Sequence, residues 1–316
     1  MPWAMWLDSS GERAGGYDIL VADPVYRVVC HGEDTSVVDR QGSTSSSGEA
    51  LLDILRALLD RQVDDDGDLP FAGGAVGYLS YDFGRRLQGL SIKDAVPGFP
   101  EAALGIYDWA LVLDHPNEQA WLTGPDSDSR PVEYWQSLEQ SLRTSVAPVI
   151  TGQVSGFVGQ PVSNMNHAAY AEAFRRIQDY LTEGDCYQVN LAQRFTLGFN
   201  ADPWQLYLQM RKQNPAPYAA YLDLPFGKVL SSSPEQFVGL SGGRVITRPI
   251  KGTRPRGDTE EEDESLAAAL QLSEKDRAEN LMIVDLLRND LGRVCEPGSI
   301  QVPELFRVET YPCLLY

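Results

Sequence analysis

Apolar positions in the first half of the chain follow two different periods. The run 17–22 (YDILVA) is typical of a strand, whereas 50–59 carries its leucines and isoleucine at helical spacing. The segment 71–84 (FAGGAVGYLSYDFG) combines small residues with aromatic ones, which indicates a closely packed buried strand. The apolar run 106–113 predicts one further strand. This half is therefore expected to mix strands with helices.

A stretch rich in Gly, Ser, Pro and Val at 146–165 is interpreted as a linker. We therefore expect an N-terminal subdomain at 1–150 and a second region at 151–316. The second region begins with a predicted helix, which Asn166 caps and Gly184 ends. Strands are predicted next at 187–197, 217–224, 228–232 and 244–250, followed by a last helix around 275–291.

The chain carries 26 basic and 45 acidic residues among its 316, a formal net charge of −19. Such a charge repels phosphate backbones and anionic lipid, so binding to nucleic acid or to a membrane surface is not expected. The sequence contains no signal-peptide pattern and no apolar window long enough to span a bilayer. The four cysteines and three histidines are dispersed, as expected for reduced thiols in a cytoplasmic protein without a zinc site.

The segment 248–257 (RPIKGTRPRG) runs against this acidic trend. Lys251 ends a predicted strand directly before Gly252 and Thr253, where the chain must turn. A lysine at such a place is usually a surface charge. The three arginines near it also allow a local anion site, in which neighbouring positive charges favour the neutral amine that a nucleophile needs. Gly252 and Thr253 would then offer N–H groups and a hydroxyl to a carboxylate.

Two carboxylates are further candidates. Glu279 opens the helical run 279–294 and shares its apolar stripe with Met282. A carboxylate on that face is costly unless a cation or hydrogen-bond donors compensate it. Two interpretations remain open: a first-turn glutamate that reaches out to solvent, or a ligand for a hard metal ion such as Mg²⁺. Glu235 lies between two strand-like segments, and its importance depends on whether it meets Lys251 in space.

These segments, in this order, resemble the chorismate-utilising enzymes. The matching motifs of the second region are GDCYQVNLAQRF (184–195), NPAPY (214–218), SSSPEQF (231–237), RPIKGTRPRG (248–257) and AENLMIVDLLRNDLGRV (278–294). Nearer the N-terminus, the motifs similar to component I of aminodeoxychorismate synthases are WLDSSG (6–11), YDILVADP (17–24) and GGAVGYLSYDFGRR (73–86). The resemblance covers essentially the whole chain.

The resemblance implies an activity and the residues that perform it. Component I of these synthases replaces the 4-hydroxyl of chorismate by an amino group in the synthesis of 4-aminobenzoate and folate. A separate glutamine amidotransferase subunit supplies the ammonia. By this resemblance Lys251 would attack C2 of the ring while Glu235 protonates the leaving hydroxyl, and Gly252 and Thr253 would contact chorismate. Mg²⁺, held in part by Glu279, would bind the ring carboxylate.

The lysine of the PIKGT motif separates the subfamilies. Anthranilate synthases, which are similar elsewhere, typically carry alanine at the position of Lys251, so anthranilate synthase component I is the alternative enzyme. Members of the family continue well past the VETYP motif (308–312) into a part with further substrate and metal contacts, so we expect this chain to be truncated. A non-catalytic remnant that binds only a ligand or the amidotransferase is the other alternative.

The resemblance also implies a fold and a tryptophan pocket. The fold is α+β, with two large antiparallel β-sheets packed as a sandwich, helices outside, and the C-terminal part missing. The positions that match the tryptophan pocket of the family are Ser9, Ala14, Gly15, Gly16, Tyr17, Pro217, Tyr218 and Ala219. Ordinary turn and core roles remain an open interpretation of these positions.

Overall fold

The computed structural model describes residues 2–10, 16–60, 69–91, 96, 98–124, 130–144, 154–311 and 314–315. The chain divides into two compact units. The first joins Met1–Pro148 to Met210–Tyr316, and the second is Val149–Gln209. The first unit therefore takes segments from both sides of the linker that the sequence predicts.

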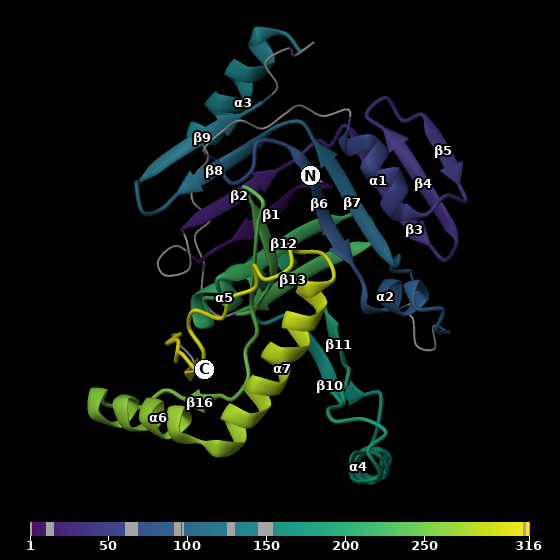
Figure 1. The fold of residues 1–316 in the computed structure, drawn as a ribbon. Coiled ribbons are helices and arrows are strands. Elements are labelled where there is room, and N and C mark those ends of the chain that lie inside the picture. The colour runs from purple at the N-terminus through teal and green to yellow at the C-terminus, as the bar shows by residue number, and fades with distance from the viewer. Residues whose placement is uncertain are drawn as a thin grey trace. The chain divides into compact units, whose positions relative to one another are not determined.

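A six-stranded antiparallel sheet in the first unit combines segments from both of its parts (Figure 1). The sheet has the order β13-β12-β1-β2-β8-β9. Its strands are β1 (Met5–Asp8), β2 (Tyr17–Val21), β8 (Ala110–Asp114), β9 (Gln119–Thr123), β12 (Tyr218–Leu224) and β13 (Gly227–Ser233). Strand β1 pairs with β12 in the register Asp8↔Ala219. This pairing joins the N-terminal strand to a segment that follows the linker.

A second antiparallel sheet has five strands in the order β5-β4-β3-β7-β6. They are β3 (Tyr26–His31), β4 (Asp34–Asp39), β5 (Thr44–Ser47), β6 (Gly74–Leu79) and β7 (Ala102–Tyr107). Helix α1 (Leu51–Leu59) buries one face, formed by Leu51, Ile54, Leu55 and Leu58. Helix α2 (Tyr81–Leu87) begins after Ser80, whose hydroxyl accepts a hydrogen bond from the Phe83 N–H. The helix predicted at 50–59 and the strand predicted within 71–84 are both confirmed.

The two sheets pack face to face. Their shared core contains Trp3, Met5, Val21, Ala110, Val112, Leu222 and Leu224 from the side of the six-stranded sheet, and Val76, Ala103 and Tyr107 from the five-stranded sheet. A second core lies between the five-stranded sheet and α1. This arrangement confirms the predicted α+β class, with two antiparallel sheets as a sandwich and a helix outside.

Small residues let β6 and β7 approach closely. A Cβ added at Gly77 would lie 2.0 Å from the carbonyl oxygen of Ala103 and 2.7 Å from the Cα of Leu104, where no side chain fits. The buried strand that the sequence predicts in 71–84 therefore has a direct steric reason for its glycine.

One predicted strand is wrong in its extent. The sequence predicts a single strand over 106–113, but the chain leaves the five-stranded sheet at Tyr107 and enters the six-stranded sheet at Ala110. Asp108 at this bend forms ion pairs of 3.0 Å with both Arg40 and Arg130. Arg130 lies just before α3 (Val132–Thr144). Both strands contribute to the shared core, so apolar residues flank the bend on both sides and Asp108 is its one charged residue.

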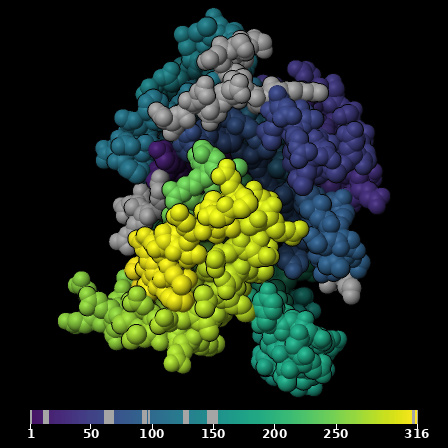
Figure 2. Space-filling model, in the orientation of Figure 1, coloured from purple at the N-terminus to yellow at the C-terminus, as the bar shows by residue number. Residues whose placement is uncertain are grey.

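The remainder of the first unit, residues 234–315, is called here the C-terminal segment. It contains the hairpin of β14 (Gln236–Ser241) and β15 (Arg244–Arg248), the short strands β16 (Arg254–Pro255) and β17 (Leu314–Leu315), and the helices α6 (Glu260–Leu272) and α7 (Glu274–Gly292). Of its described residues only Leu270 and Leu315 are buried. Figure 2 shows the atoms of α7, in yellow, at the surface.

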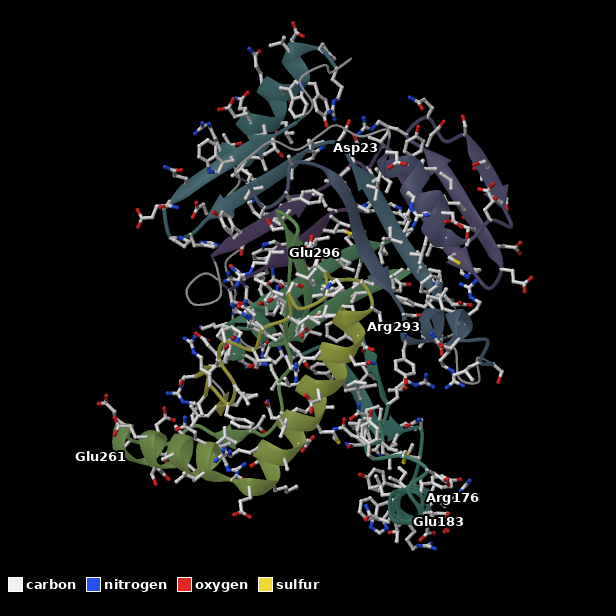
Figure 3. The ribbon with its side chains drawn as sticks, in the orientation of Figure 1. Asp23, Arg176, Glu183, Glu261, Arg293 and Glu296 are labelled. Atoms are coloured by element: carbon white, nitrogen blue, oxygen red, sulfur yellow. The ribbon has the colours of Figure 1, made fainter. Side chains whose placement is uncertain are left out.

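An acidic run opens α6. Thr259 accepts a hydrogen bond from the Glu262 N–H at 3.2 Å, and four carboxylates occupy the first turn. Negative charges there interact favourably with the positive end of the helix dipole. Figure 3 shows Glu261 pointing away from the ribbon, whereas Asp263 in the same turn pairs with Arg256.

The second unit consists of a strand pair and helices. Strands β10 (Phe157–Ser163) and β11 (Phe195–Phe199) are antiparallel, and α4 (His167–Glu183) lies between them in sequence. Asn166 caps α4 and Gly184, with φ of 81°, ends it, as predicted. The strand predicted at 187–197 forms only from Phe195, because no described strand pairs with 187–194. Helix α5 (Pro203–Gln213) continues from this unit into the first.

Candidate active site

The β14–β15 hairpin brings together the two chain segments that precede and follow it, each of which carries one predicted catalytic residue. Gln236 pairs with Arg248, so Glu235 just before β14 and Lys251 just after β15 leave the hairpin at the same end. The Glu235 carboxylate accepts a hydrogen bond of 3.2 Å from the backbone N–H of Ile250. The candidate acid therefore lies against the residue that precedes the candidate nucleophile, although 15 positions separate the two bonded residues in sequence.

Lys251, Gly252 and Thr253 form a connection between β15 and β16 without regular secondary structure. The Lys251 side chain is half-buried, and its amine has no hydrogen bond or ion pair with any residue that the structure describes. Gly252 has a φ of +78°, a conformation that favours glycine. Thr253 is exposed. The segment can present an amine, backbone N–H groups and a hydroxyl to a ligand.

Two of the three arginines near Lys251 are held by carboxylates. Arg254 Nη2 lies 2.8 Å from Asp276 Oδ2, and Arg256 forms a two-pronged pair with Asp263, with a shortest distance of 2.7 Å. The cluster of cations that the sequence suggests as an anion site is thus largely neutralised inside the protein. Sequence reasoning missed the two aspartates because they lie on helices 7 and 22 positions away.

These pairs shift the ionisation of both aspartates. The pKa of Asp276 is lowered by a hydrogen bond from the Ser273 hydroxyl and by the Arg254 guanidinium. The pKa of Asp263 is lowered mainly by hydrogen bonds from Arg256, and also by the Gly257 N–H. Both carboxylates are therefore ionised at neutral pH, and their pairs with the arginines persist there.

Glu279 lies on α7, one turn after Asp276, and is half-buried. Within the described residues no three His, Cys, Asp or Glu side chains gather as a metal site. Mg²⁺, however, usually keeps several waters and takes only one or two protein carboxylates together with oxygens of the substrate. A single half-buried carboxylate such as Glu279 fits that donor set as a partial ligand.

The structure brings together the two segments predicted to form a tryptophan pocket. The hydroxyl of Ser10 hydrogen-bonds with both the N–H and the carbonyl of Ala216, 206 positions away, at 3.1 Å. Ser9 donates from its N–H and its hydroxyl to the carboxylate of Asp18 at 2.8 and 2.9 Å. Pro217 and Ala219 are buried nearby in sequence, at the start of β12.

The other residues predicted for this pocket differ in burial and in their contacts. Gly16 is buried, with a φ of +78°, and a Cβ there would lie 2.2 Å from the Pro116 ring. The hydroxyl of Tyr218 lies 3.1 Å from Gln236 Oε1, next to Glu235 in sequence. Burial raises the pKa of Tyr218. Tyr17 is half-buried on β2, and Ala14 and Gly15 lie outside the described residues.

Buried charges beside this region were not predicted from the sequence. The Asp8 side chain is fully buried, with Oδ2 2.6 Å from Arg211 Nε and Oδ1 accepting from the Ser10 N–H at 2.7 Å. Arg211 also stacks over the Trp6 ring, 5.2 Å from its centroid. Asp18 lies 3.1 Å from the His115 imidazole. The sequence indicates these buried charges only by an aspartate at an inward position of an otherwise apolar strand.

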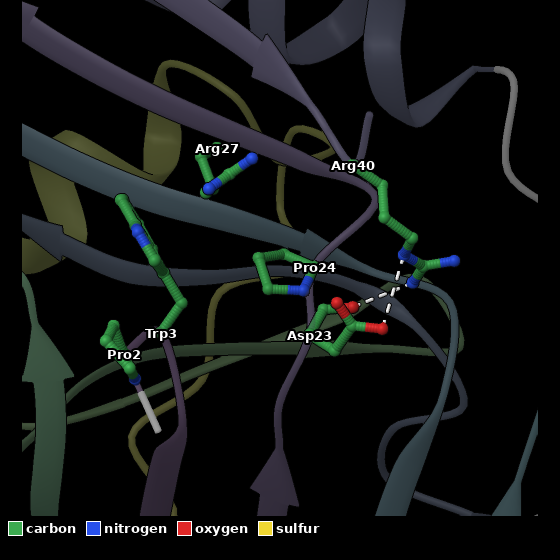
Figure 4. Close-up of a pocket in the computed structure, with 6 residues that line it drawn as sticks. All are labelled: Pro2, Trp3, Asp23, Pro24, Arg27 and Arg40. Carbon is green, nitrogen blue, oxygen red and sulfur yellow. Dashed lines mark hydrogen bonds and ion pairs between the residues drawn. The ribbon is translucent and has the colours of Figure 1, made fainter. Parts of the chain in front are cut away.

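A small cavity of about 150 Å³ lies elsewhere in the first unit (Figure 4). Its lining consists of Pro2, Trp3, Asp23, Pro24, Arg27 and Arg40. The guanidinium of Arg40 is bound to Asp23 and Asp108, and that of Arg27 donates to the carbonyl of Asp39 at 2.8 Å. The cavity contains none of the residues predicted for catalysis.

Comparisons with known proteins support the family and the fold that the sequence motifs indicate. Residues 4–315 match the family described as chorismate binding enzyme. The chain belongs to this family, as the motifs predicted. It is 44% identical over 320 residues to aminodeoxychorismate synthase component 1 of Klebsiella aerogenes and 41% identical to that of Escherichia coli (strain K12). Each alignment covers 99% of this chain and 68% of the relative.

The solved structure of anthranilate synthase component I from Streptococcus pneumoniae TIGR4 has a similar fold, with a TM-score of 0.79 at 27% identity. That match covers 95% of this chain and 67% of the other. It confirms the predicted likeness of the fold to anthranilate synthase component I. None of the helices in the described part of this chain has the length and apolarity that a membrane crossing requires.

Proposed function

We propose that this chain is the chorismate-converting component of an aminodeoxychorismate synthase. It replaces the 4-hydroxyl of chorismate by an amino group and takes ammonia from a separate glutamine amidotransferase subunit. The observation that carries the proposal is the hydrogen bond from the Ile250 N–H to the carboxylate of Glu235, because Ile250 directly precedes the lysine of the PIKGT motif. The high identity to relatives that bear this name supports it.

The proposed reaction divides the work between two side chains. The neutral amine of Lys251 attacks C2 of the chorismate ring, both ring double bonds shift by one position, and the 4-hydroxyl leaves C4. The nitrogen, which becomes positively charged on forming the bond to C2, then loses a proton. Glu235 donates a proton to that hydroxyl, because hydroxide itself is a poor leaving group. Ammonia then adds at C4, both double bonds shift back, and the bond between C2 and Lys251 breaks. The added ammonia loses one proton, and the departing lysine nitrogen takes one up. The product is 4-amino-4-deoxychorismate, and the lysine is regenerated.

The neighbouring groups orient the substrate in this proposal. The backbone N–H groups of the Lys251–Gly252 turn and the hydroxyl of Thr253 bind a carboxylate of chorismate. Glu279 would hold Mg²⁺ in part, and the ion would supply positive charge to the ring carboxylate. The chain acts in the cytoplasm, where chorismate and the amidotransferase are available to it.

Tryptophan is the proposed occupant of the region around Ser9, Gly16 and Pro217. Two observations support it: the N-terminal segment and the start of β12 are joined by the bonds of Ser10 to Ala216, and a buried carboxylate, Asp18, lies at Ser9. Calorimetric titration with L-tryptophan tests this part separately. Binding that Ser9→Ala or Asp18→Asn weakens would support it, and no measurable heat would contradict it.

The function is tested by incubating the chain with chorismate, Mg²⁺ and ammonium, so that no amidotransferase is needed, and separating the products by chromatography. Formation of 4-amino-4-deoxychorismate supports the proposal. Formation of anthranilate would favour the alternative enzyme of the family instead. Unchanged chorismate under conditions in which the chain is folded would favour a role in binding alone.

A further inference from the structure

Helices α6 and α7 meet at Ser273, close to the Lys251 connection. Ser273 ends α6 and caps α7, and its hydroxyl accepts a hydrogen bond of 3.3 Å from the Asp276 N–H. The carboxylate of Asp276 pairs with Arg254 at 2.8 Å, and the two side chains are only 16% and 30% exposed. Asp276 is thus fixed by its own helix cap on one side and by Arg254 on the other.

Asp276 touches the connection at a second point. A Cβ added at Gly252 would lie 2.8 Å from the Asp276 Cβ and 3.1 Å from the Leu270 side chain. The backbone next to Lys251 therefore packs directly on the start of α7, and a larger residue would push it away. One aspartate holds the connection by packing at Gly252 and by an ion pair at Arg254.

The same helix carries Glu279. It lies three positions after Asp276, which corresponds to about 4.5 Å along the helix axis. Whatever fixes the connection to the first turn of α7 therefore also fixes its separation from the Glu279 carboxylate.

The geometry points to Asp276 as a positioning residue, which together with Arg254 locks the backbone that carries Lys251 onto the helix that carries Glu279. This inference rests on the proposed function, because it assigns Lys251 and Glu279 to one substrate. Without the lock, Lys251 spends less time at the distance and angle that attack on C2 requires. Small errors in such geometry lower the rate of the chemical step more than the affinity for substrate.

The test compares two ion pairs of the same kind. Asp276→Asn and Arg254→Gln each remove the pair beside Lys251, and Asp263→Asn removes the Arg256–Asp263 pair, which leads to α6 instead. We expect kcat to fall about tenfold or more in the first two variants with KM little changed, and to stay within about twofold in the third. The double variant of Asp276 and Arg254 should lose no more than either single variant. Arg254→Lys should restore part of the rate.

A second measurement does not depend on turnover. Lys251 is labelled with an amine-reactive reagent, and its rate of modification is followed by mass spectrometry in the wild-type chain and in the three single variants. Because Lys251 is half-buried, we expect Asp276→Asn and Arg254→Gln to raise its rate several-fold, and Asp263→Asn to leave it unchanged. Hydrogen exchange of 249–256 should follow the same order.

These readouts separate the two ideas. If the wild-type chain makes no 4-amino-4-deoxychorismate but the labelling rates differ as expected, the proposed function fails and the positioning role of Asp276 stands. Equal labelling and equal kcat in all variants would overturn the positioning role. It would also be overturned if Asp263→Asn and Asp276→Asn lowered kcat and thermal stability alike, since that result describes general stabilisation.

Discussion

The β-sandwich and the C-terminal segment 234–315 are stabilised by different kinds of interaction. The sandwich has two apolar cores and many fully buried side chains. The described part of the C-terminal segment buries only Leu270 and Leu315, and ion pairs such as Arg254–Asp276 and Arg256–Asp263 connect its elements. The first region gains stability from removal of apolar surface from water, and the second from oriented charges.

The candidate catalytic residues all lie in the less buried region. Glu235, Lys251 and Glu279 come from a hairpin end, a turn and a helix of the C-terminal segment, none of which contributes to the sandwich cores. Local opening costs less free energy where few apolar contacts must be broken. The comparison therefore suggests a rigid scaffold that carries a reactive segment whose geometry depends on a few polar contacts.

The largest expected effect is a loss of catalytic activity in a chain that remains folded. Lys251→Ala should lower formation of 4-amino-4-deoxychorismate about a thousandfold or more, roughly 4 kcal/mol in the barrier, because no enzyme amine can then bond to C2. Products aminated or hydroxylated at C2 are expected instead, since ammonia or water can attack that carbon directly. Product chromatography measures the change.

Lys228→Ala is the matched control for this prediction. Lys228 is paired with Asp223 at the β12–β13 turn and belongs to the sandwich. The control should retain the wild-type product and rate. Equal production of the C4-aminated compound by Lys251→Ala would reduce Lys251 to an electrostatic role.

The same substitution in the two regions should give very different losses of stability. Ile106→Ala removes a side chain that is 0% exposed in the core under α1, and the free energy of unfolding should fall by about 2–5 kcal/mol. Ile246→Ala, in β15 at 38% exposure, should cost less than about 1 kcal/mol. Urea unfolding followed by circular dichroism measures both. Similar losses would mean that the C-terminal segment is packed as tightly as the sandwich.

A buried and an exposed ion pair sharpen the comparison further. Asp8→Asn removes the charge of a fully buried side chain that pairs with Arg211, and we expect a loss of roughly 1–3 kcal/mol. Asp285→Asn breaks the exposed Arg288 pair on α7 and should change stability by at most about 0.5 kcal/mol. Thermal and urea unfolding of the two variants provide the values. An equal effect would contradict the assumption that burial sets the strength of these pairs.

The sequence predicted the elements whose stabilising contacts are local. The cap at Asn166, the stop at Gly184 and the amphipathic stripe of α1 depend on residues within a few positions, and all three form as expected. The strand over 106–113 failed because the bend at Asp108 depends on Arg40 and Arg130, which are distant in sequence. Of the strand predicted at 187–197, the part 187–194 does not form, because strand formation needs a partner that periodicity does not reveal.

The candidate site shows the same limit. Motif order identified Lys251, Glu235 and Glu279 as candidates, and the bond from Ile250 holds the carboxylate of Glu235 at the residue before Lys251. The ion pairs that take up Arg254 and Arg256 were not predictable, because the pairing depends on how α6 and α7 fold back on the connection. A cluster of basic residues in a sequence therefore shows how many positive charges lie close together along the chain. It does not show how many of them are already paired with carboxylates in the folded protein.

The smallest expected effect concerns acid, and its direction follows from the lowered pKa values of Asp263 and Asp276. An aspartate with a lowered pKa in the folded chain binds fewer protons there than in the unfolded chain, in which the pKa of aspartate is about 3.9. The stabilisation is therefore complete above that value and is lost as pH falls below it through the folded pKa. Between pH 7 and 5 the contribution of these two groups to stability should not change.

Hydrogen exchange of 254–277, corrected for the intrinsic dependence on pH, should accelerate relative to that of β7 below about pH 4, because β7 is held by apolar burial. In the double variant Asp263→Asn, Asp276→Asn the segment should exchange faster already at pH 7, and the additional acceleration in acid should be smaller. An unchanged acid response in that variant would show that other carboxylates control the opening of this segment.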